Sequence, residues 1–335
     1  MKMFDLKGTV LALTTPNIVS LLNSIELYRG KTLVVSNLKK LDALKKIARK
    51  SDAIASNYLG NVFLSDIEEK DLFEKGKPAS SFSQHIVKGY CEALELIDKV
   101  YKFQPFDRSF ISTLHYYMYR GYNPEIGGKF KDTQNYIQEM MPDGNYHTIF
   151  VPAAPEEAIP LLDNLIYQFN ALVTDDEINK LILIASFLLD FMCIHPYSHG
   201  NGRLSRLILN FLLKKFGYNL VDFYSVSYII KQRIGDYIDA FEGSAHGWEE
   251  NTNDYSIYVS FLLRSILEVN NMGGTADEKI YKVVNDSATP ITKQVVQNIL
   301  YSTSPATIEK SLAALQKAGK IQLITKGRYS KYFRM

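Results

Sequence analysis

Residues 195–206 read His-Pro-Tyr-Ser-His-Gly-Asn-Gly-Arg-Leu-Ser-Arg. Pro196 ends any helix that precedes it, and Gly200 and Gly202 permit backbone angles that other residues resist. After them, apolar residues recur every three to four positions, which predicts a helix. These apolar residues are Leu204, Ile208, Leu209, Leu212, Leu213 and Phe216. The segment is therefore a turn that leads directly into a helix N-terminus.

The polar residues of this segment suit the binding of phosphate. Free amides and the positive end of the dipole make a helix N-terminus an anion site. Arg203 and Arg206 lie three positions apart, on roughly one helix face, and can bind the same polyphosphate. His195 precedes them, placed to accept a proton from an attacking hydroxyl. Each feature alone is common in loops and on solvated helix faces, but together and in this order they predict a phosphate site with a base beside it.

The segment resembles the signature of the Fic family, His-Pro-Phe-x-Asp/Glu-Gly-Asn-Gly-Arg-x-x-Arg. Seven of its nine specified positions agree, Tyr197 is another aromatic residue in place of the phenylalanine, and His199 replaces the acid. The resemblance implies an enzyme that moves AMP from ATP to a Ser, Thr or Tyr hydroxyl of a target protein, or, as in a few relatives, transfers another phosphate-linked group. It implies His195 as the general base. It implies nucleotide binding by His199, Gly200, Asn201, Gly202, Arg203 and Arg206.

The resemblance covers about residues 85 to 270. Residues 127–137 resemble the flap, a hairpin that lies over the active site and aligns the target. Residues 236–241 resemble the helix beside the adenine pocket. The implied target-binding residues are Lys131, Thr133, Gln134 and Asn135, and the implied adenine-side residues are Tyr237 and Ile238.

Because of His199, the sequence does not decide which metal ion binds at the site. Family members carry an acid there that binds magnesium, which prefers oxygen ligands, whereas imidazole suits zinc and other transition metals. Water in place of the carboxylate, a softer ion, or a donor other than ATP are the alternatives. We expect ATP as the donor, with Mg or Mn. His195 and His199 have the spacing of a helical zinc pair, but Pro196 disfavours a helix across both.

A second departure concerns regulation. Many long Fic proteins carry an inhibitory helix, Ser/Thr-x-x-x-Glu-Gly/Asn, whose glutamate pairs with the last arginine of the signature. Residues 51–57 read Ser-Asp-Ala-Ile-Ala-Ser-Asn, so Ser51 sets the frame and Ala55 stands in place of the glutamate. Alanine cannot form that pair, which predicts that Arg206 is free for phosphate. The enzyme is then either constitutively active or restrained in another way.

Residues 276–335, called here the C-terminal module, differ in charge from the rest. They hold ten basic and four acidic residues, a net charge of +6; the whole chain has +2, which leaves −4 for the residues before it. A polar, glycine-bearing boundary at 270–275 precedes three expected helices, the third beginning at Ser304-Pro305, and then a hairpin with Lys326 and Arg328 at its tip. This order resembles a winged helix-turn-helix, which binds DNA or serves in protein docking or dimerisation.

Composition limits the remaining possibilities. The chain has 335 residues and 46% hydrophobic residues, enough for a large core and about two domains. We expect no membrane partner, because no apolar run approaches the roughly twenty residues that span a bilayer. The N-terminus lacks a signal peptide, and Cys91 and Cys193 suggest no disulfide framework. These features predict a cytoplasmic protein.

The predicted fold is mainly α: a Fic helical core at 85–270 with a β-hairpin flap, an N-terminal helical extension at 1–84 and a winged helix at 276–335. The predicted function is protein adenylyl transfer. Two alternatives are open: a Fic-type transferase with another nucleotide or phosphate-linked donor, and a DNA-binding regulator that senses nucleotide. A homodimer is possible, and the target protein is not specified by the sequence.

Overall fold

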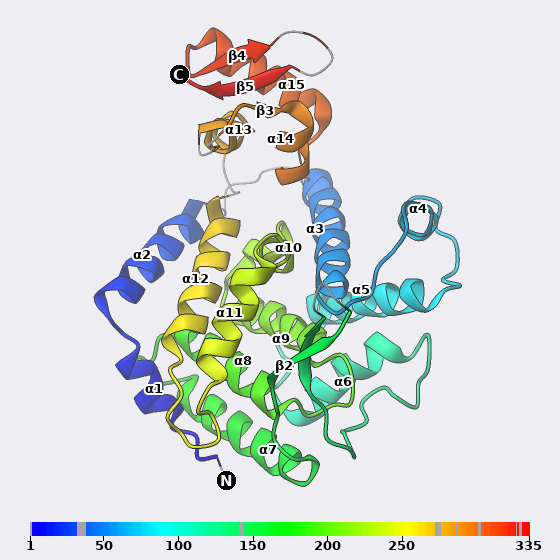
Figure 1. The fold of residues 1–335 in the computed structure, drawn as a ribbon, viewed down its shortest axis with the longest axis vertical. Coiled ribbons are helices and arrows are strands. Elements are labelled where there is room, and N and C mark those ends of the chain that lie inside the picture. Colours follow the sequence, from blue (N-terminus) through cyan, green and yellow to red (C-terminus); the bar gives the residue numbers. More distant parts are fainter. Residues whose placement is uncertain are drawn as a thin grey trace.

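Helix α8, Lys180–Ile194, lies at the centre of the protein because it is apolar on every side. Each of its residues from Leu181 to Ile194 is buried, the pattern of a helix enclosed by others. In the computed structural model it is surrounded by α1, α7, α9, α11 and α12 (Figure 1). The structure describes residues 2–31, 38–140, 144–271, 276–285, 287, 289–300, 303–325, 327 and 330–335.

The chain is mainly helical, as predicted. The helices before α8 are α1 Leu6–Ala12, α2 Pro16–Lys31, α3 Leu38–Tyr58, α4 Asp66–Phe73, α5 Phe82–Val100, α6 Arg108–Tyr119 and α7 Pro155–Leu172. Those that follow it are α9 Asn201–Lys215, the 3-10 helix η1 Asn219–Asp222, α10 Val226–Gln232, α11 Ile234–Ala245 and α12 Ser256–Asn271. Strands β1 Ile137–Met140 and β2 Tyr146–Phe150 form one antiparallel hairpin.

The predicted helix after the Gly-Asn-Gly turn is confirmed as α9, and thirteen of its residues are buried. The N-terminal segment is helical as well, with α2 and α3 as its longest helices. These N-terminal helices pack into the same core as α8: α1 contacts α7 and α8, α2 contacts α12, and α3 contacts α5, α9 and α10. The division at residue 84 stays a prediction.

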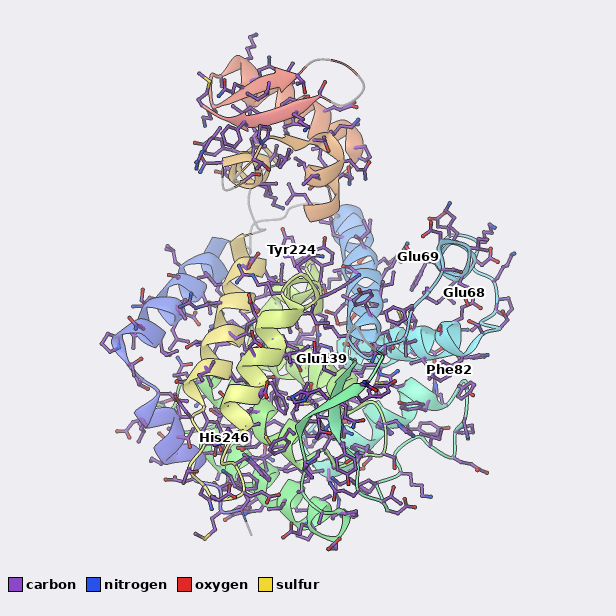
Figure 2. All side chains as sticks on the ribbon, viewed as in Figure 1. Glu68, Glu69, Phe82, Glu139, Tyr224 and His246 are labelled. Atoms are coloured by element: carbon purple, nitrogen blue, oxygen red, sulfur yellow. The ribbon has the colours of Figure 1, made fainter. Side chains whose placement is uncertain are left out.

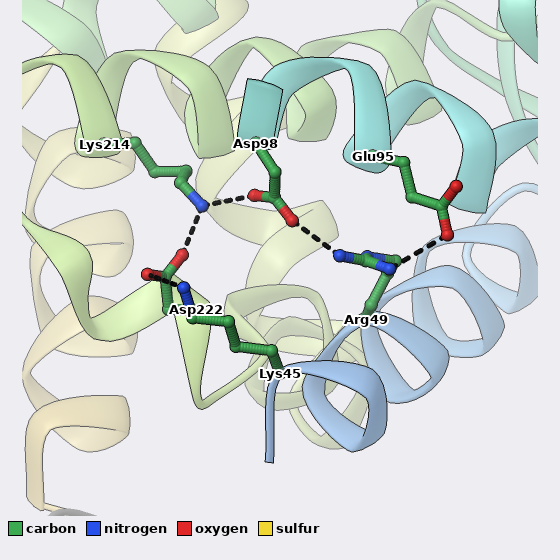
Figure 3. Close-up of polar contacts among 6 residues, drawn as sticks. All are labelled: Lys45, Arg49, Glu95, Asp98, Lys214 and Asp222. Atoms are coloured by element: carbon green, nitrogen blue, oxygen red, sulfur yellow. Dashed lines mark hydrogen bonds and ion pairs between the residues drawn. The ribbon is translucent and has the colours of Figure 1, made fainter. Parts of the chain in front are cut away.

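Helix α3 is held against the core by an ion network (Figure 3). Arg49 of α3 pairs with Glu95 at 2.9 Å and with Asp98 at 2.7 Å, both on α5. Lys45, also on α3, pairs with Asp222 of η1 at 3.2 Å. Lys214 of α9 joins the two halves, because its ammonium pairs with both Asp98 and Asp222. The network therefore ties α3 to α5, α9 and η1.

A buried carboxylate adds a second attachment for α3. Asp52 is 4% exposed, and its oxygens accept four hydrogen bonds from other parts of the fold. The donors are Tyr90 Oη (3.0 Å), Asn210 Nδ2 (3.3 Å), Ser225 Oγ (2.6 Å) and the Ser227 N–H (3.3 Å). Because a buried carboxylate is stable only when its oxygens are bonded, this position fixes α3 relative to α5, α9 and α10.

The C-terminal module contains α13 Ala276–Asn285, β3 Ile291–Thr292, α14 Lys293–Ile299, α15 Pro305–Lys317, β4 Ile321–Thr325 and β5 Lys331–Arg334. The three strands pair in the order β3-β5-β4. The module lies at one end of the molecule, beyond α3 and α12 (Figure 1). The three expected helices and the hairpin are present, whereas Lys326 and Arg328 lie outside the described residues. Its identity as a winged helix stays a prediction.

Within the described residues, no single helix is long and apolar enough to cross a membrane. One bent pair of helical segments, Leu6–Ala12 with Pro16–Leu27 at 91°, passes the same test by length and composition.

Asp52→Ala is expected to lower the free energy of unfolding by about 3 kcal/mol, because it leaves the buried donors of Tyr90, Asn210 and Ser225 without their acceptor. Urea unfolding measures the change. The control is Glu95→Ala, which removes a half-exposed partner of Arg49 and is expected to cost only about 0.5 kcal/mol. Equal losses in the two variants would contradict the role of Asp52.

Candidate active site

The signature turn joins the two most buried helices. His195 caps the C-terminus of α8 with φ 51° and ψ 60°, in the left-handed region. Gly200 caps the N-terminus of α9 with φ 78°. For a residue with a Cβ this conformation is strained by about 1 kcal/mol or more. At Gly200 there is also no space, since a Cβ would lie 2.8 Å from Tyr119 Oη. The chain thus reverses direction over six residues.

Gly202 does not need an unusual conformation, which corrects the sequence-based expectation. It lies inside α9 with an ordinary helical backbone. A Cβ there would lie 3.6 Å from Arg206 Nη1, at an ordinary contact distance. A Cβ at residue 202 would therefore fit beside the guanidinium of Arg206.

A stack of three rings packs against the signature turn. Tyr197 lies between Phe130, at 4.9 Å between ring centroids, and His115, at 4.2 Å. His115 Nδ1 accepts from the Gly128 N–H at 2.8 Å, so its Nε2–H donates to the His199 carbonyl at 2.9 Å. Burial lowers the pKa of His115 to about 4, which keeps this ring neutral. Both ring nitrogens of His115 are therefore bonded to the backbone of the site.

Asn201 also builds the turn. Its side chain is buried and both ends bond to Tyr197: Oδ1 accepts from the Tyr197 N–H at 3.0 Å, and Nδ2 donates to the Tyr197 carbonyl at 2.6 Å. The amide side chain is thus engaged in the fold, and any phosphate contact falls to the backbone. Gly200 makes no side-chain cap, so the first amides of α9 have the arrangement of an anion site.

His195 has the geometry of a general base. Its Nδ1 lies 3.2 Å from the Met192 carbonyl. Because a carbonyl only accepts, the proton sits on Nδ1 and the lone pair on Nε2. Burial lowers the pKa of His195 to about 4, and the charge of Lys131 contributes in the same direction. The half-buried ring is therefore neutral near pH 7 and able to accept a proton.

Neither arginine of the signature is free, which corrects the expectation for Arg206. Its Nε donates to Ser56 Oγ at 2.7 Å and its Nη2 to the Ser56 carbonyl at 2.7 Å. Arg203 donates to Tyr119 Oη at 2.7 Å and to Asn57 Oδ1 at 3.3 Å. Both guanidinium groups are buried. The end of α3 therefore occupies the arginines although Ala55 has replaced the glutamate.

Glu68 and Glu69, the first glutamates that follow α3 in the sequence, have other partners. Glu68 completes the capping box of α4 with Ser65 and accepts from Ser81 Oγ at 2.6 Å. Glu69 pairs with Lys50 at 2.9 Å. Figure 2 shows both acids on the arm that carries α4, away from the signature turn. Ser51 lies on α3 one turn before Ala55, which is itself buried.

Tyr237 and Ile238, which the resemblance places beside the adenine, lie on α11. Tyr237 lies beside Arg206. Burial raises the pKa of the Tyr237 phenol, and the Arg206 guanidinium partly offsets this rise. Its ring packs against Phe261 at 5.8 Å. Ile238 is half-buried on the same helix, and the His199 side chain is exposed.

The flap differs from its prediction. Residues 127–136 are irregular, and the hairpin begins only at Ile137. Thr133 is exposed, whereas Gln134 donates to the Pro152 carbonyl at 2.9 Å and Asn135 donates to the Tyr197 carbonyl at 3.0 Å. Lys131 is 5% exposed and its ammonium donates to backbone carbonyls inside the protein, and its contact with a target stays a prediction. These side chains attach the flap to the signature turn.

Two groups in the site were missed by sequence reasoning. Tyr119, which bonds Arg203, precedes the signature by more than seventy residues, and no motif singles it out. Ser56 lies in the segment that resembles the inhibitory motif, but the motif assigns it no role. In the structure, its hydroxyl and its carbonyl both accept hydrogen bonds from Arg206. No cluster of three or more His, Cys, Asp or Glu side chains suited to a metal occurs in the described parts of the chain.

His195 and His115 are expected to remain neutral at pH 5.5, where an exposed histidine is largely protonated. Two-dimensional 15N NMR of the imidazoles measures this, with the urea-unfolded chain as the reference. Because both folded pKa values lie below the unfolded value of about 6.5, the unfolded state binds more protons between pH 6.5 and 4. The free energy of unfolding should thus fall as the pH is lowered through that range. Titration of both rings near pH 6.5 would contradict the burial of the site.

The Fic/DOC family model matches residues 105–213. A Fic family protein from Desulfovibrio desulfuricans G20 has a similar structure, with a TM-score of 0.61, 18% identity and 96% of each chain covered. A Fic domain containing signaling protein from Bacteroides thetaiotaomicron has a TM-score of 0.60 at 19% identity, covering 76% of this chain and 94% of that one. Fic-1 from C. elegans has a TM-score of 0.57 at 16% identity, covering 78% of this chain and 73% of that one. No curated protein matches the sequence.

The matched residues include α6, α7, α8, the signature turn and nearly all of α9. They contain His195, Arg203 and Arg206. Residues 105–213 are therefore similar to the Fic/DOC family, and the chain shares the fold of these Fic structures.

Proposed function

We propose that this protein transfers AMP from ATP to a hydroxyl of a target protein. The carrying observation is the position of the neutral His195 ring, with its lone pair on Nε2, in the turn that leads into the uncapped N-terminus of α9. A base for an attacking hydroxyl and amides for a phosphate thus belong to one turn. The two arginines on α9 add positive charge for the outer phosphates.

In the proposed reaction the target hydroxyl attacks the α-phosphorus of ATP. The new bond joins that oxygen to the α-phosphorus, the bond to the bridging oxygen breaks, and pyrophosphate leaves. Nε2 of His195 takes the hydroxyl proton, a contribution of about 10²–10⁴ in rate. The amides of the turn and the arginines stabilise the charge that develops on the phosphates.

The protein side chains near the turn do not fit a directly bound magnesium ion. His199 supplies a nitrogen where oxygen is preferred, and Asn201 Oδ1 is occupied by the Tyr197 N–H. We therefore assign no step to a protein-held metal. Magnesium or manganese enters this proposal only as an ion bound to ATP.

Binding of the outer phosphates requires Arg206 to exchange partners. Ser56 holds it through two neutral acceptors, which bind a guanidinium less strongly than a carboxylate does. A phosphate carries negative charge and can displace them. The same contact restrains the enzyme without nucleotide, which corresponds to the second regulatory alternative, restraint by other means than a glutamate.

Intact-mass spectrometry tests the transfer. After incubation with ATP and either Mg or Mn, the wild-type chain, alone or with candidate targets, is expected to give a product heavier by one adenylyl group. His195→Ala should give no product while binding ATP with a dissociation constant within about threefold of wild type, because it removes the base alone. Loss of binding in this variant would identify a structural histidine.

Ser56→Ala is expected to strengthen ATP binding up to about tenfold, because one hydrogen bond to the Arg206 guanidinium no longer has to be broken. Isothermal titration calorimetry gives the dissociation constants. Ser51→Ala, on the same helix but one turn or more from both arginine contacts, is the control and should leave binding unchanged. Equal affinities for all three chains would show that Ser56 does not compete with nucleotide.

Two other functions have specific support. His199 favours a donor other than ATP-Mg, and a thermal-shift panel of nucleotides with magnesium, manganese and zinc distinguishes the donors. The net charge of +6 on the C-terminal module favours a nucleotide-sensing regulator that binds DNA. The module also fits protein docking or a homodimer.

A further inference from the structure

His195 depends on neighbouring groups for its backbone conformation. At φ 51° and ψ 60° it occupies a region that a residue with a Cβ rarely adopts. The His195 N–H donates to the Phe191 carbonyl at 2.9 Å, and this bond links His195 only to the preceding helix, α8. Such a conformation persists where the surrounding structure specifies it on both sides.

Lys131 bonds the backbone on both sides of His195. Its Nζ donates to the Ile194 carbonyl at 3.0 Å, and its N–H donates to the Pro196 carbonyl at 2.9 Å. The same ammonium donates to the Ala153 carbonyl at 2.6 Å and to Asn135 Oδ1 at 3.3 Å. One residue therefore fixes the carbonyls immediately before and after the histidine.

The buried positive charge of Lys131 is not balanced by a negative charge nearby in the part of the chain that the structure describes. Within the described ranges, no acidic side chain lies within ion-pair distance of its Nζ, and its acceptors are neutral oxygens. Burying an ammonium is costly, and an apolar side chain of similar length would avoid that cost. The benefit lies at the end of α8, where a cation interacts favourably with the last carbonyls of the helix.

The neighbours of Lys131 extend the same attachment. Phe130 forms an isolated β-bridge with Tyr197. Asn135 donates to the Tyr197 carbonyl at 3.0 Å. Residues 130–135 thus run beside residues 194–197, and Lys131 is the member of this segment that reaches the backbone of the histidine's own neighbours.

We propose that Lys131 is the positioning residue of His195, holding the histidine in its left-handed conformation so that Nε2 is presented to the attacking hydroxyl. As far as catalysis is concerned, the proposal rests on the proposed function. It assigns to Lys131 an internal role in place of contact with the target.

The test compares Lys131→Met, Lys131→Arg and the control Lys129→Met, which changes an exposed lysine two residues away. We expect K131M to lower kcat about a hundredfold, the loss that a small misplacement of a catalytic group produces, with the ATP dissociation constant within twofold of wild type. K131R should recover most of kcat, because a guanidinium can also donate to several carbonyls. K129M should match wild type.

The second readout is independent of activity. The 13Cα and 13Cβ shifts of His195 report its backbone conformation by NMR, and they should move in K131M and stay unchanged in K129M. If the wild-type chain transfers nothing, the proposed function fails, but these shifts still decide the positioning role. Unchanged shifts in a folded K131M, or in Lys131→Gln where K131M does not fold, would overturn it. Equal losses of kcat and ATP affinity, with no recovery in K131R, would overturn it as well.

Discussion

The left-handed backbone of His195, at the end of a helix buried on every side, is the constraint on which the site depends. Because α8 and α9 are both enclosed, the polar groups of the turn that joins them must find partners inside the protein. The side chains that do this come from the turn itself and from distant segments. Asn201 bonds Tyr197, and His115 bonds the His199 carbonyl. Much of the signature thus builds the turn, and only part of it remains for substrate.

The two signature arginines show how the fold accommodates buried positive charge without an acidic partner among the described residues. Both guanidinium groups are buried against neutral partners, Ser56 and Asn57 of α3 and Tyr119 of α6. A carboxylate at residue 55 would give a stronger pair, and a phosphate would then compete less well. Hydroxyl, amide and carbonyl acceptors satisfy the donors at lower strength. With alanine at residue 55, the arginines are therefore held by weaker contacts and stay buried.

The sequence predicted the helical fold and the turn into α9, because both are specified by local patterns. It does not specify a side chain's contacts with distant partners. The resemblance places Lys131 at the target, whereas in the structure its ammonium donates to the carbonyls of Ala153 and Ile194. Arg206 was expected to be free because only residue 55 was considered, whereas the adjacent Ser56 reaches it. A motif specifies residue types, and the direction of a side chain follows from packing that the motif does not contain.

The attachment of α3 decides how its contact with Arg206 can open. The ion network and the buried Asp52 hold the middle of the helix to α5, α9 and η1, so displacement of the whole helix would break both. Figure 2 labels Tyr224, which accepts a 3.0 Å bond from Lys279 of the C-terminal module and follows η1 in the chain.

Contacts therefore connect the C-terminal module with α3 through Tyr224 and η1. They reach α3 in its middle, which the ion network and Asp52 hold most firmly. A chain of contacts alone does not transmit a signal unless an element along it has two arrangements. The end of α3 is better suited to this, since Asn61 adopts a left-handed conformation just beyond it and Gly60 follows the residues that bond the arginines. Unwinding this last turn would release Ser56 and Asn57 while Asp52 stays in place. Opening the contact with Arg206 at the end of α3 thus requires less disruption of the fold than a shift of the whole helix driven from the C-terminal module.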